Sequence, residues 1–329
     1  MTKVKDKTRK ISVRIAESKL ECLMQEYQTD NITDIINYLV EDKFDKMFSD
    51  KNKRSVITGI GTKNLVAKKI IDLMPKHSIY IEPFGNTASV LLQKERVKKE
   101  VYNDINKEVT HFFLVLRENP IGLYNACVTL PYSEAYFQEL KNVPIPTDPV
   151  ERAARFFFLN RGSFLGSIDT GFRYQLVERN FSKFYYKECN RFYAVSKRFQ
   201  GVEILARDFR KVIKAYSLYE QALFLCDPPY YAATNHYNTP FGLKEHIDLA
   251  HLLTQIKGKC MVCHDKNYQI HKLYLELGFK YDIIETHYYS KKWKEDKKHR
   301  HPTELYIYRN FERDSEITGI DNKQVMSRK

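Results

Sequence analysis

The sequence predicts an α/β protein built on an open, mostly parallel sheet with helices on both faces, a helical insertion and a small N-terminal strand–helix–helix module. Three segments carry this prediction: Ile79–Leu91, Glu100–Asn106 and Leu223–Tyr231. Each begins with a short apolar run and continues into an acid, a glycine turn or prolines, which end a strand. Helix-forming stretches follow the first two, and parallel strands are joined by such crossovers. Sheets of this kind bind ligands outside the carboxyl ends of their strands.

Composition narrows the class of partner. The chain has 329 residues, with 54 Lys and Arg against 41 Asp and Glu, so its formal net charge is +13. This balance favours a polyanionic partner, and 23 Tyr and 20 Phe suit base stacking as well as an ordinary core. Neither a signal peptide nor a run of 18 apolar residues is found, and the six Cys are scattered. We therefore expect a protein of the reducing cytoplasm, without a membrane partner or a disulfide framework.

Residues 1–50 are predicted to form a separate module. Ile11–Ile15 alternates apolar and polar residues, as a strand with one dry face does, and Ala16–Gln28 and Ile32–Phe48 have helical spacing. Strand, helix and helix in this order resemble a ribbon-helix-helix DNA-binding module. The resemblance implies a homodimer with paired strands, whose ribbon turns Lys10, Ser12 and Arg14 toward bases. The alternative is a small helical dimerisation appendage.

The polar segment 49–55 is predicted to be a linker, and a glycine turn, Ile57–Lys63, follows it, ahead of a helix predicted over Asn64–Met74. A second glycine turn lies in Ile79–Leu91, where Gly85 lets the backbone approach a ligand. The strand Glu100–Asn106 then ends in Asp104, about twenty residues after that turn, which is the spacing at which Rossmann-type sheets hold ribose hydroxyls. These three segments predict a nucleoside-containing ligand at one edge of the sheet.

From about residue 119 to 200 the alternation of strand and helix disappears. Pro-bounded helices, many arginines and many aromatic residues occupy this interval. Basic and aromatic residues together suit contact with DNA. We expect the Phe156–Phe158 run to be core, and the sheet to resume with Val202–Leu205 and Arg207–Phe209. Two further strands are expected at Cys260–Cys263 and Glu304–Tyr308.

The segment Leu223–Tyr231 carries the most informative motif, Asp227-Pro228-Pro229-Tyr230. Two consecutive prolines stiffen the turn, because each fixes φ and lacks an N–H group. Such a turn can hold the Asp227 carboxylate and the Pro228 carbonyl side by side as acceptors, with the Tyr230 ring alongside. Two acceptors and a flat apolar face suit an exocyclic amine on an aromatic base.

This motif resembles the catalytic motif of nucleic-acid amino methyltransferases that use S-adenosylmethionine, and the resemblance is best to the Dam-like (D12 class) DNA N6-adenine methyltransferases. Further similarities follow in the same order over roughly residues 57–311. The resemblance implies a class I methyltransferase (Rossmann-like) sheet, S-adenosylmethionine as co-substrate and double-stranded DNA as partner. It divides the chain into a cofactor half (55–118), a target-recognition insertion (119–200), a catalytic half (201–311) and a tail (312–329).

The resemblance also assigns residues. It implies catalytic roles for Asp227, Pro228, Pro229 and Tyr230, and a DNA contact for Arg161 in the insertion. The residues implied to contact the cofactor are Lys63, Glu82, Phe84, Gly85, Asp104, Asp208, Phe209 and Asp227. Two positions depart from the family pattern: Gly59 replaces a usual aromatic residue, and Asn86 replaces a usual second glycine.

The expected reaction is methyl transfer to N6 of an adenine flipped out of duplex DNA. No metal is required, and Cys260-Met-Val-Cys263-His264, which fits a haem-attachment pattern by letter, lacks the second ligand pair of a zinc site. Other acceptors remain open, namely N4 of cytosine or adenine in RNA. A non-catalytic DNA-binding repressor that retains the cofactor fold is also open. A restriction-modification setting is compatible with the predicted activity.

Overall fold

The computed structural model describes residues 17–29, 31–36, 39, 53–174, 180–231, 241–286 and 303–313. The chain divides into two compact units, Met1–Ser49 and Asp50–Lys329, which are described separately. Within the described residues, no helix combines the length and the apolar character needed to cross a bilayer.

In the first unit, helix α1 spans Glu17–Tyr27, and residues 32–36 are also helical. The Asn31 side chain accepts a hydrogen bond from the Thr33 N–H at 3.0 Å, which stabilises the start of that second helical segment. Ile35 is completely buried. The predicted strand at 11–15, with Lys10, Ser12 and Arg14, and most of the second predicted helix lie outside the described residues.

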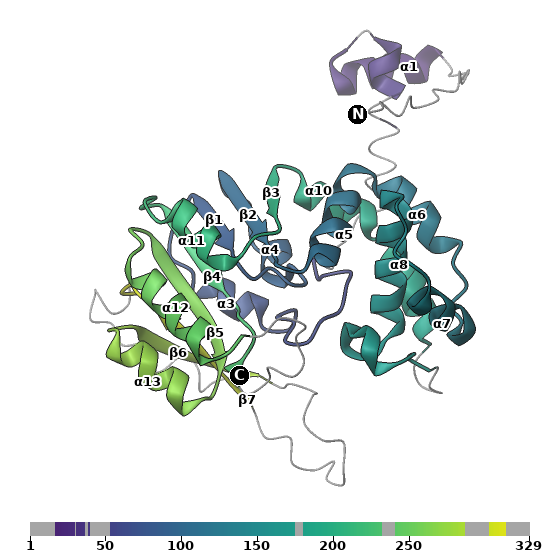
Figure 1. Ribbon diagram of the computed structural model, residues 1–329. Coiled ribbons are helices and arrows are strands. Elements are labelled where there is room, and N and C mark those ends of the chain that lie inside the picture. The colour runs from purple at the N-terminus through teal and green to yellow at the C-terminus, as the bar shows by residue number, and fades with distance from the viewer. Residues whose placement is uncertain are drawn as a thin grey trace. The chain divides into compact units, whose positions relative to one another are not determined.

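The second unit contains a seven-stranded sheet in the order β3-β2-β1-β4-β5-β7-β6 (Figure 1). Neighbouring strands from β3 to β5 are parallel, and β7 is antiparallel to both β5 and β6. This sheet confirms the predicted α/β class. The strands are β1 (Ile79–Glu82), β2 (Lys99–Asn103), β3 (Val202–Leu205), β4 (Ala222–Cys226), β5 (Lys259–Asp265), β6 (Lys280–Thr286) and β7 (Thr303–Arg309).

Strand β6 is an addition to the predicted elements. It forms one edge of the sheet and pairs only with β7 among the described strands. Tyr281 and Ile283 are exposed whereas Ile284 is buried. An edge strand of this kind contains charged residues and exposed apolar residues side by side. Its sequence therefore lacks the regular apolar run or alternation from which a strand is predicted.

Helices cover the two faces of the sheet through two separate hydrophobic clusters. Helices α11 (Phe209–Tyr216), α12 (Leu243–Thr254) and α13 (Tyr268–Glu276) pack on one face. On the other face lie α3 (Ala67–Asp72), α4 (Ser89–Gln93) and α5 (Lys107–Glu118). Because both faces are covered, β4 is buried along its whole length, as the continuous apolar run of its sequence predicts.

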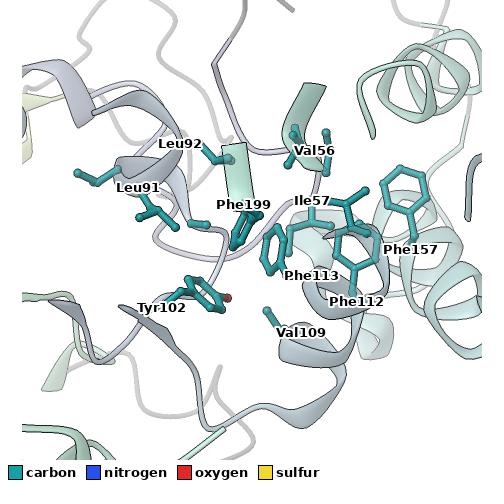
Figure 2. Close-up of a cluster of buried hydrophobic side chains, with 14 of the residues drawn as sticks. Val56, Ile57, Leu91, Leu92, Tyr102, Val109, Phe112, Phe113, Phe157 and Phe199 are labelled. Carbon is teal, nitrogen blue, oxygen red and sulfur yellow. The ribbon is translucent and has the colours of Figure 1, made fainter. Parts of the chain in front are cut away.

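The interval predicted as an insertion is helical and packs against α5 (Figure 1). Phe112 and Phe113 of α5 stack on Phe157 and Phe199, at ring separations of 5.6 and 4.6 Å (Figure 2). The residues at 156–158 are buried, as predicted, so this segment shares a core with one face of the sheet. Its helices are α6 (Pro120–Val128), α7 (Glu134–Asn142), α8 (Pro149–Gly162), α9 (Phe181–Cys189) and α10 (Phe192–Phe199).

Two element predictions need correction. The sheet does not continue through Arg207–Phe209: β3 ends at Leu205, and the Asp208 side chain accepts the Arg210 N–H at 2.8 Å, so it caps α11 instead. An aspartate followed by a helical apolar pattern favours a helix start over a strand. The helix predicted from residue 64 to 74 is shorter, because α3 spans Ala67–Asp72.

Candidate active site

The Asp-Pro-Pro-Tyr turn follows β4, which lies between β1 and β5 in the middle of the sheet. Asp227 comes directly after the last buried residue of that strand, and its side chain is 20% exposed. Pro228 is buried, and Pro229 and Tyr230 are half-buried. The two prolines cannot donate to a neighbouring strand, so the chain leaves the sheet here.

Asp227 forms an ion pair with Lys63, a residue 164 positions earlier in the chain. Lys63 Nζ lies 2.6 Å from Asp227 Oδ2 and donates to the Gly61 carbonyl at 2.7 Å. The same ammonium lies 5.1 Å from the centre of the Tyr230 ring. Burial raises the pKa of Asp227, while the Lys63 ammonium opposes that shift by favouring the carboxylate. The other carboxylate oxygen, Oδ1, is buried and has no hydrogen-bond partner in the described part of the chain.

A narrow cavity at the carboxyl ends of β1 and β4 brings many of the predicted residues together. Predicted cofactor residues that line it are Lys63, Glu82, Phe84, Gly85 and Asp227. The other lining residues are Thr62, Asn86, Thr87, Ser89, Val90, Leu225 and Cys263.

Glu82 is the buried acid of this cavity, with only 4% of the residue exposed. Its Oε1 accepts from the Tyr80 hydroxyl at 2.6 Å and from the Leu91 N–H at 2.9 Å. Burial raises the pKa of Glu82 to about 7, against the opposing effect of those two donors. A carboxylate held in this way is suited to pair with a cationic group of a ligand.

The second glycine turn is held closely against β2. A Cβ atom at Gly85 would lie 2.1 Å from the Tyr102 ring, so only glycine fits at this position. Asn86 adopts a positive φ of 42°, and its side chain donates to the Ile60 carbonyl at 3.2 Å, which links the two glycine turns. A Cβ atom at Gly59 would lie 2.7 Å from Asn86 Oδ1, so a larger residue at 59 is incompatible with this position of the Asn86 side chain.

Asp104 orients the turn rather than lining the cavity. Its Oδ2 accepts the Asn86 N–H at 2.7 Å, and its Oδ1 accepts the Asn106 N–H at 2.8 Å. Burial raises the pKa of Asp104, and both N–H donors oppose the rise. Each carboxylate oxygen keeps a second lone pair, so contact with ribose hydroxyls is compatible with these bonds and stays a prediction.

The other predicted residues lie outside the cavity lining. Asp208 forms a hydrogen-bonded ion pair with Arg210, and Phe209 is buried with its ring 5.1 Å from that of Phe84. The Arg161 side chain is 12% exposed and lies 3.9 Å from Glu188 inside the helical segment. Contact of Phe209 with an adenine and of Arg161 with DNA remain predictions.

The cavity also contains residues that sequence reasoning missed. Thr62, Thr87 and Ser89 place three hydroxyl oxygens within 2.7–3.0 Å of one another. Each is an unremarkable hydroxyl residue in its own turn, and only the folded chain brings them into one group. Three adjacent hydroxyls can reorient to donate to an anionic ligand group.

The Cys260–Cys263 pair does not form a metal site. Cys260 belongs to the hydrophobic cluster on one face of the sheet and Cys263 to the cluster on the other face. Side chains three residues apart on a strand point to opposite faces, so one ion cannot bind both. More generally, no group of three or more His, Cys, Asp or Glu that could hold a metal ion occurs among the described residues.

Comparison with known proteins agrees with this geometry. The family model of the D12 class N6 adenine-specific DNA methyltransferases matches residues 60–296. A DNA adenine methylase of Haemophilus influenzae is 24% identical over 196 residues, which cover 55% of this chain and 67% of that protein. A DNA N-6-adenine-methyltransferase of Escherichia phage P1 is 27% identical over 258 residues, 70% of this chain and 32% of the phage protein. The family match covers well over half of the chain, and the chain therefore belongs to the D12 class of N6 adenine-specific DNA methyltransferases.

Proposed function

We propose that the chain methylates N6 of an adenine flipped out of duplex DNA, and that Asp227, Pro228 and Tyr230 bind the target base. The observation that carries this assignment is the state of the Asp227 carboxylate. Lys63 holds one oxygen, and the other is buried beside the cavity without a partner in the described residues. A buried acceptor without a donor is costly, so it is suited to a donor that the substrate brings.

The residues that line the cavity are chemically suited to S-adenosylmethionine, which would supply the reactive methyl group. Glu82 is a buried carboxylate for the ammonium of the methionine part, and the hydroxyls of Thr62, Thr87 and Ser89 can donate to its carboxylate. The close approach of the Gly85 turn to Tyr102 leaves the backbone, rather than a side chain, facing the ligand. Asp104, which follows β2 and holds that turn, is the residue that we assign to the ribose hydroxyls.

The chemistry explains why an acid and a carbonyl are needed. The lone pair of adenine N6 is delocalised into the ring, so the amino group is a poor nucleophile. When Asp227 Oδ1 and the Pro228 carbonyl accept its two N–H bonds, the nitrogen is favoured to become tetrahedral, with its lone pair available. Asp227 then also stabilises the positive charge that develops on the nitrogen. Lys63 limits the rise in the pKa of Asp227 and so favours the charged carboxylate.

Access to the amino nitrogen requires extrusion of the base from the helix, because N6 of a paired adenine is hydrogen-bonded to thymine and its lone pair faces the stacked neighbouring bases. Flipping costs a few kcal/mol, and stacking on an aromatic ring offsets part of that cost. Tyr230 is half-buried beside the Lys63 ammonium and is the ring that we assign to this contact. The net charge of +13 supports binding to the phosphate backbone.

The test compares Asp227→Asn and Asp227→Ala with Asp282→Asn. Asp282 is a matched control, because it is also ion-paired, with Arg309, but belongs to the edge strand β6. Transfer of labelled methyl to duplex DNA should fall at least a thousandfold in both Asp227 variants, with DNA affinity retained, whereas Asp282→Asn should keep near-normal turnover.

Nucleoside analysis of the product should show N6-methyladenine. Label in N4-methylcytosine, or only in RNA, would contradict the proposed acceptor. Near-normal turnover of Asp227→Ala would remove the proposed role of this carboxylate.

A further inference from the structure

A buried histidine near the end of β5, His264, contacts the two tyrosines that follow Pro229 in the Asp-Pro-Pro-Tyr turn. His264 is completely buried, and β5 is held on both sides, by β4 and by β7. The backbone of His264 is in register with Tyr306 of β7, so the residue belongs to a rigid part of the sheet. Strands β4 and β5 are parallel neighbours, with Cys226 opposite Val262, which brings His264 beside the turn that follows β4.

The two ring nitrogens of His264 have different partners. Nδ1 is hydrogen-bonded to the Asp265 carbonyl oxygen at 2.9 Å, an atom that can only accept, and it lies 2.8 Å from Asp265 Oδ1 without hydrogen-bond geometry. Nδ1 therefore carries the proton, which leaves a lone pair on Nε2. That lone pair accepts the backbone N–H of Tyr231 at 3.3 Å. Asp265 thus fixes the tautomer that makes Nε2 an acceptor.

The hydrogen bond matters because the turn has few other backbone donors. Pro228 and Pro229 have no N–H, so Tyr230 and Tyr231 are the first residues after Asp227 that can donate from the backbone. The His264 ring also lies 5.0 Å from the Tyr230 ring and 5.1 Å from the buried His246 ring. Burial lowers the pKa of His246 to about 3, so this second ring is uncharged at neutral pH and packs against His264 as a neutral group.

We propose that His264 is the positioning residue of the catalytic turn: by accepting the Tyr231 N–H through Nε2, it fixes the turn that places Asp227 and Tyr230 at the substrate base. His264 does not contact the reacting atoms in this assignment. Its effect is on the geometry in which Asp227 Oδ1 and the Pro228 carbonyl are presented to the amino group. The inference rests on the proposed role of Asp227 in transfer.

The proposal predicts different outcomes for substitutions of similar size. In His264→Gln the amide oxygen can occupy the place of Nε2 and accept the Tyr231 N–H. His264→Met fills a similar volume without a strong acceptor, and methionine is tolerated in buried sites. His264→Asn reaches only the position of Nδ1. We expect kcat of the Gln variant within about threefold of the wild type, and kcat of the Met and Asn variants lower by about tenfold or more, as expected for one lost hydrogen bond to a buried donor.

The measurement is single-turnover and steady-state methyl transfer to duplex DNA by the full chain, with melting temperature as the folding check. The KM values for S-adenosylmethionine and DNA should change by no more than about twofold, because the cavity residues are untouched. His271→Met is the matched control. It breaks the contact of another histidine, 3.3 Å from the Tyr308 hydroxyl, outside the site, and should keep normal kcat.

Equal kcat in the Gln and Met variants, or a loss expressed in KM alone, would overturn the positioning role. If the Asn variant does not fold, the comparison of Gln with Met still decides the question. Failure of this proposal is distinct from failure of the proposed catalysis, because Asp227→Asn tests the latter in a chain with His264 intact.

Discussion

At the scale of single residues, the site contains two acids, Asp227 and Glu82, that differ in the groups bound to their carboxyl oxygens. Asp227 has a cation at 2.6 Å, whereas the direct hydrogen-bond donors to Glu82 among the described residues are a hydroxyl and a backbone N–H. Burial raises the pKa of both acids, that of Glu82 to about 7. The structure thus contains one carboxylate with an internal lysine as its partner and one suited to gain its counter-charge from a ligand.

Glu82 should make cofactor binding depend on pH. Its folded pKa of about 7 lies above the ordinary value of 4.5, so between these values the folded protein holds a proton that the unfolded chain has released. Stability contributed by this group therefore falls as pH rises through that window. Binding of an ammonium group requires the carboxylate, so the Kd for S-adenosylmethionine should fall as pH rises toward 7, by up to about tenfold per unit, and then level off.

Calorimetric titration between pH 6 and 8 measures this dependence. In Glu82→Gln we expect weaker binding with a much smaller pH slope, because the titrating group is gone. An unchanged slope in that variant would assign the dependence to another residue.

At the scale of elements, the carboxyl ends of β1, β2 and β3 are joined by one side chain. Asn103 is completely buried; its amide nitrogen donates to the Pro83 carbonyl at 2.8 Å and to the Arg207 carbonyl at 2.9 Å. Its amide oxygen accepts the Arg207 N–H at 2.9 Å. The glycine turn and the loop before α11 are therefore fixed relative to β2 by three hydrogen bonds from a single residue.

Asn103→Ala should lower the free energy of unfolding by about 2–4 kcal/mol, because it leaves buried backbone groups without partners. It should also weaken cofactor binding, since the Gly85 turn loses part of its support. Chemical denaturation and cofactor titration measure the two effects. Asn106→Ala is the control: Asn106 caps α5, and its loss should cost about 1 kcal/mol without a change in cofactor affinity. Equal effects of both variants on binding would contradict the proposed link.

At the scale of the whole molecule, the chain consists of a catalytic unit and a separate N-terminal unit. We propose that residues 1–50 form a ribbon-helix-helix-like module that makes the protein a dimer and adds DNA affinity. The reason is that apolar and polar residues alternate over Ile11–Ile15, which predicts a strand. A single strand of five residues is not stable in water without a partner strand. The helix α1 and the following helical segment are compatible with such a module.

Deletion of residues 1–50 should give a monomer that retains methyl transfer. Its DNA binding should be weaker and less dependent on salt, because Lys10, Arg14 and the neighbouring basic residues no longer neutralise phosphates. Analytical ultracentrifugation and DNA titrations at several salt concentrations measure these properties. A truncated protein that stays dimeric, or binds DNA unchanged, would reduce the module to an appendage.

The sequence by itself determined those features that depend on neighbouring residues. The apolar runs and their terminators predicted six of the seven strands, and Asp-Pro-Pro-Tyr with its two glycine turns identified the family. It also placed Gly85, whose lack of a side chain the Tyr102 ring requires. Local pattern failed at β6, whose edge position mixes polar and apolar residues, and at Asp208, where capping of a helix prevailed over strand propensity.

Only the tertiary structure decided which residues meet across the carboxyl edge of the sheet. Lys63 and Asp227, 164 residues apart, form an ion pair because the first glycine turn lies against the carboxyl end of β4. Three hydroxyls from two separate turns form one group, and His264, which follows Cys263 in the sequence, accepts the backbone N–H of Tyr231 beside the Asp-Pro-Pro-Tyr turn. Such contacts depend on strand order and register, and these are set by the packing of both faces of the sheet rather than by any segment alone.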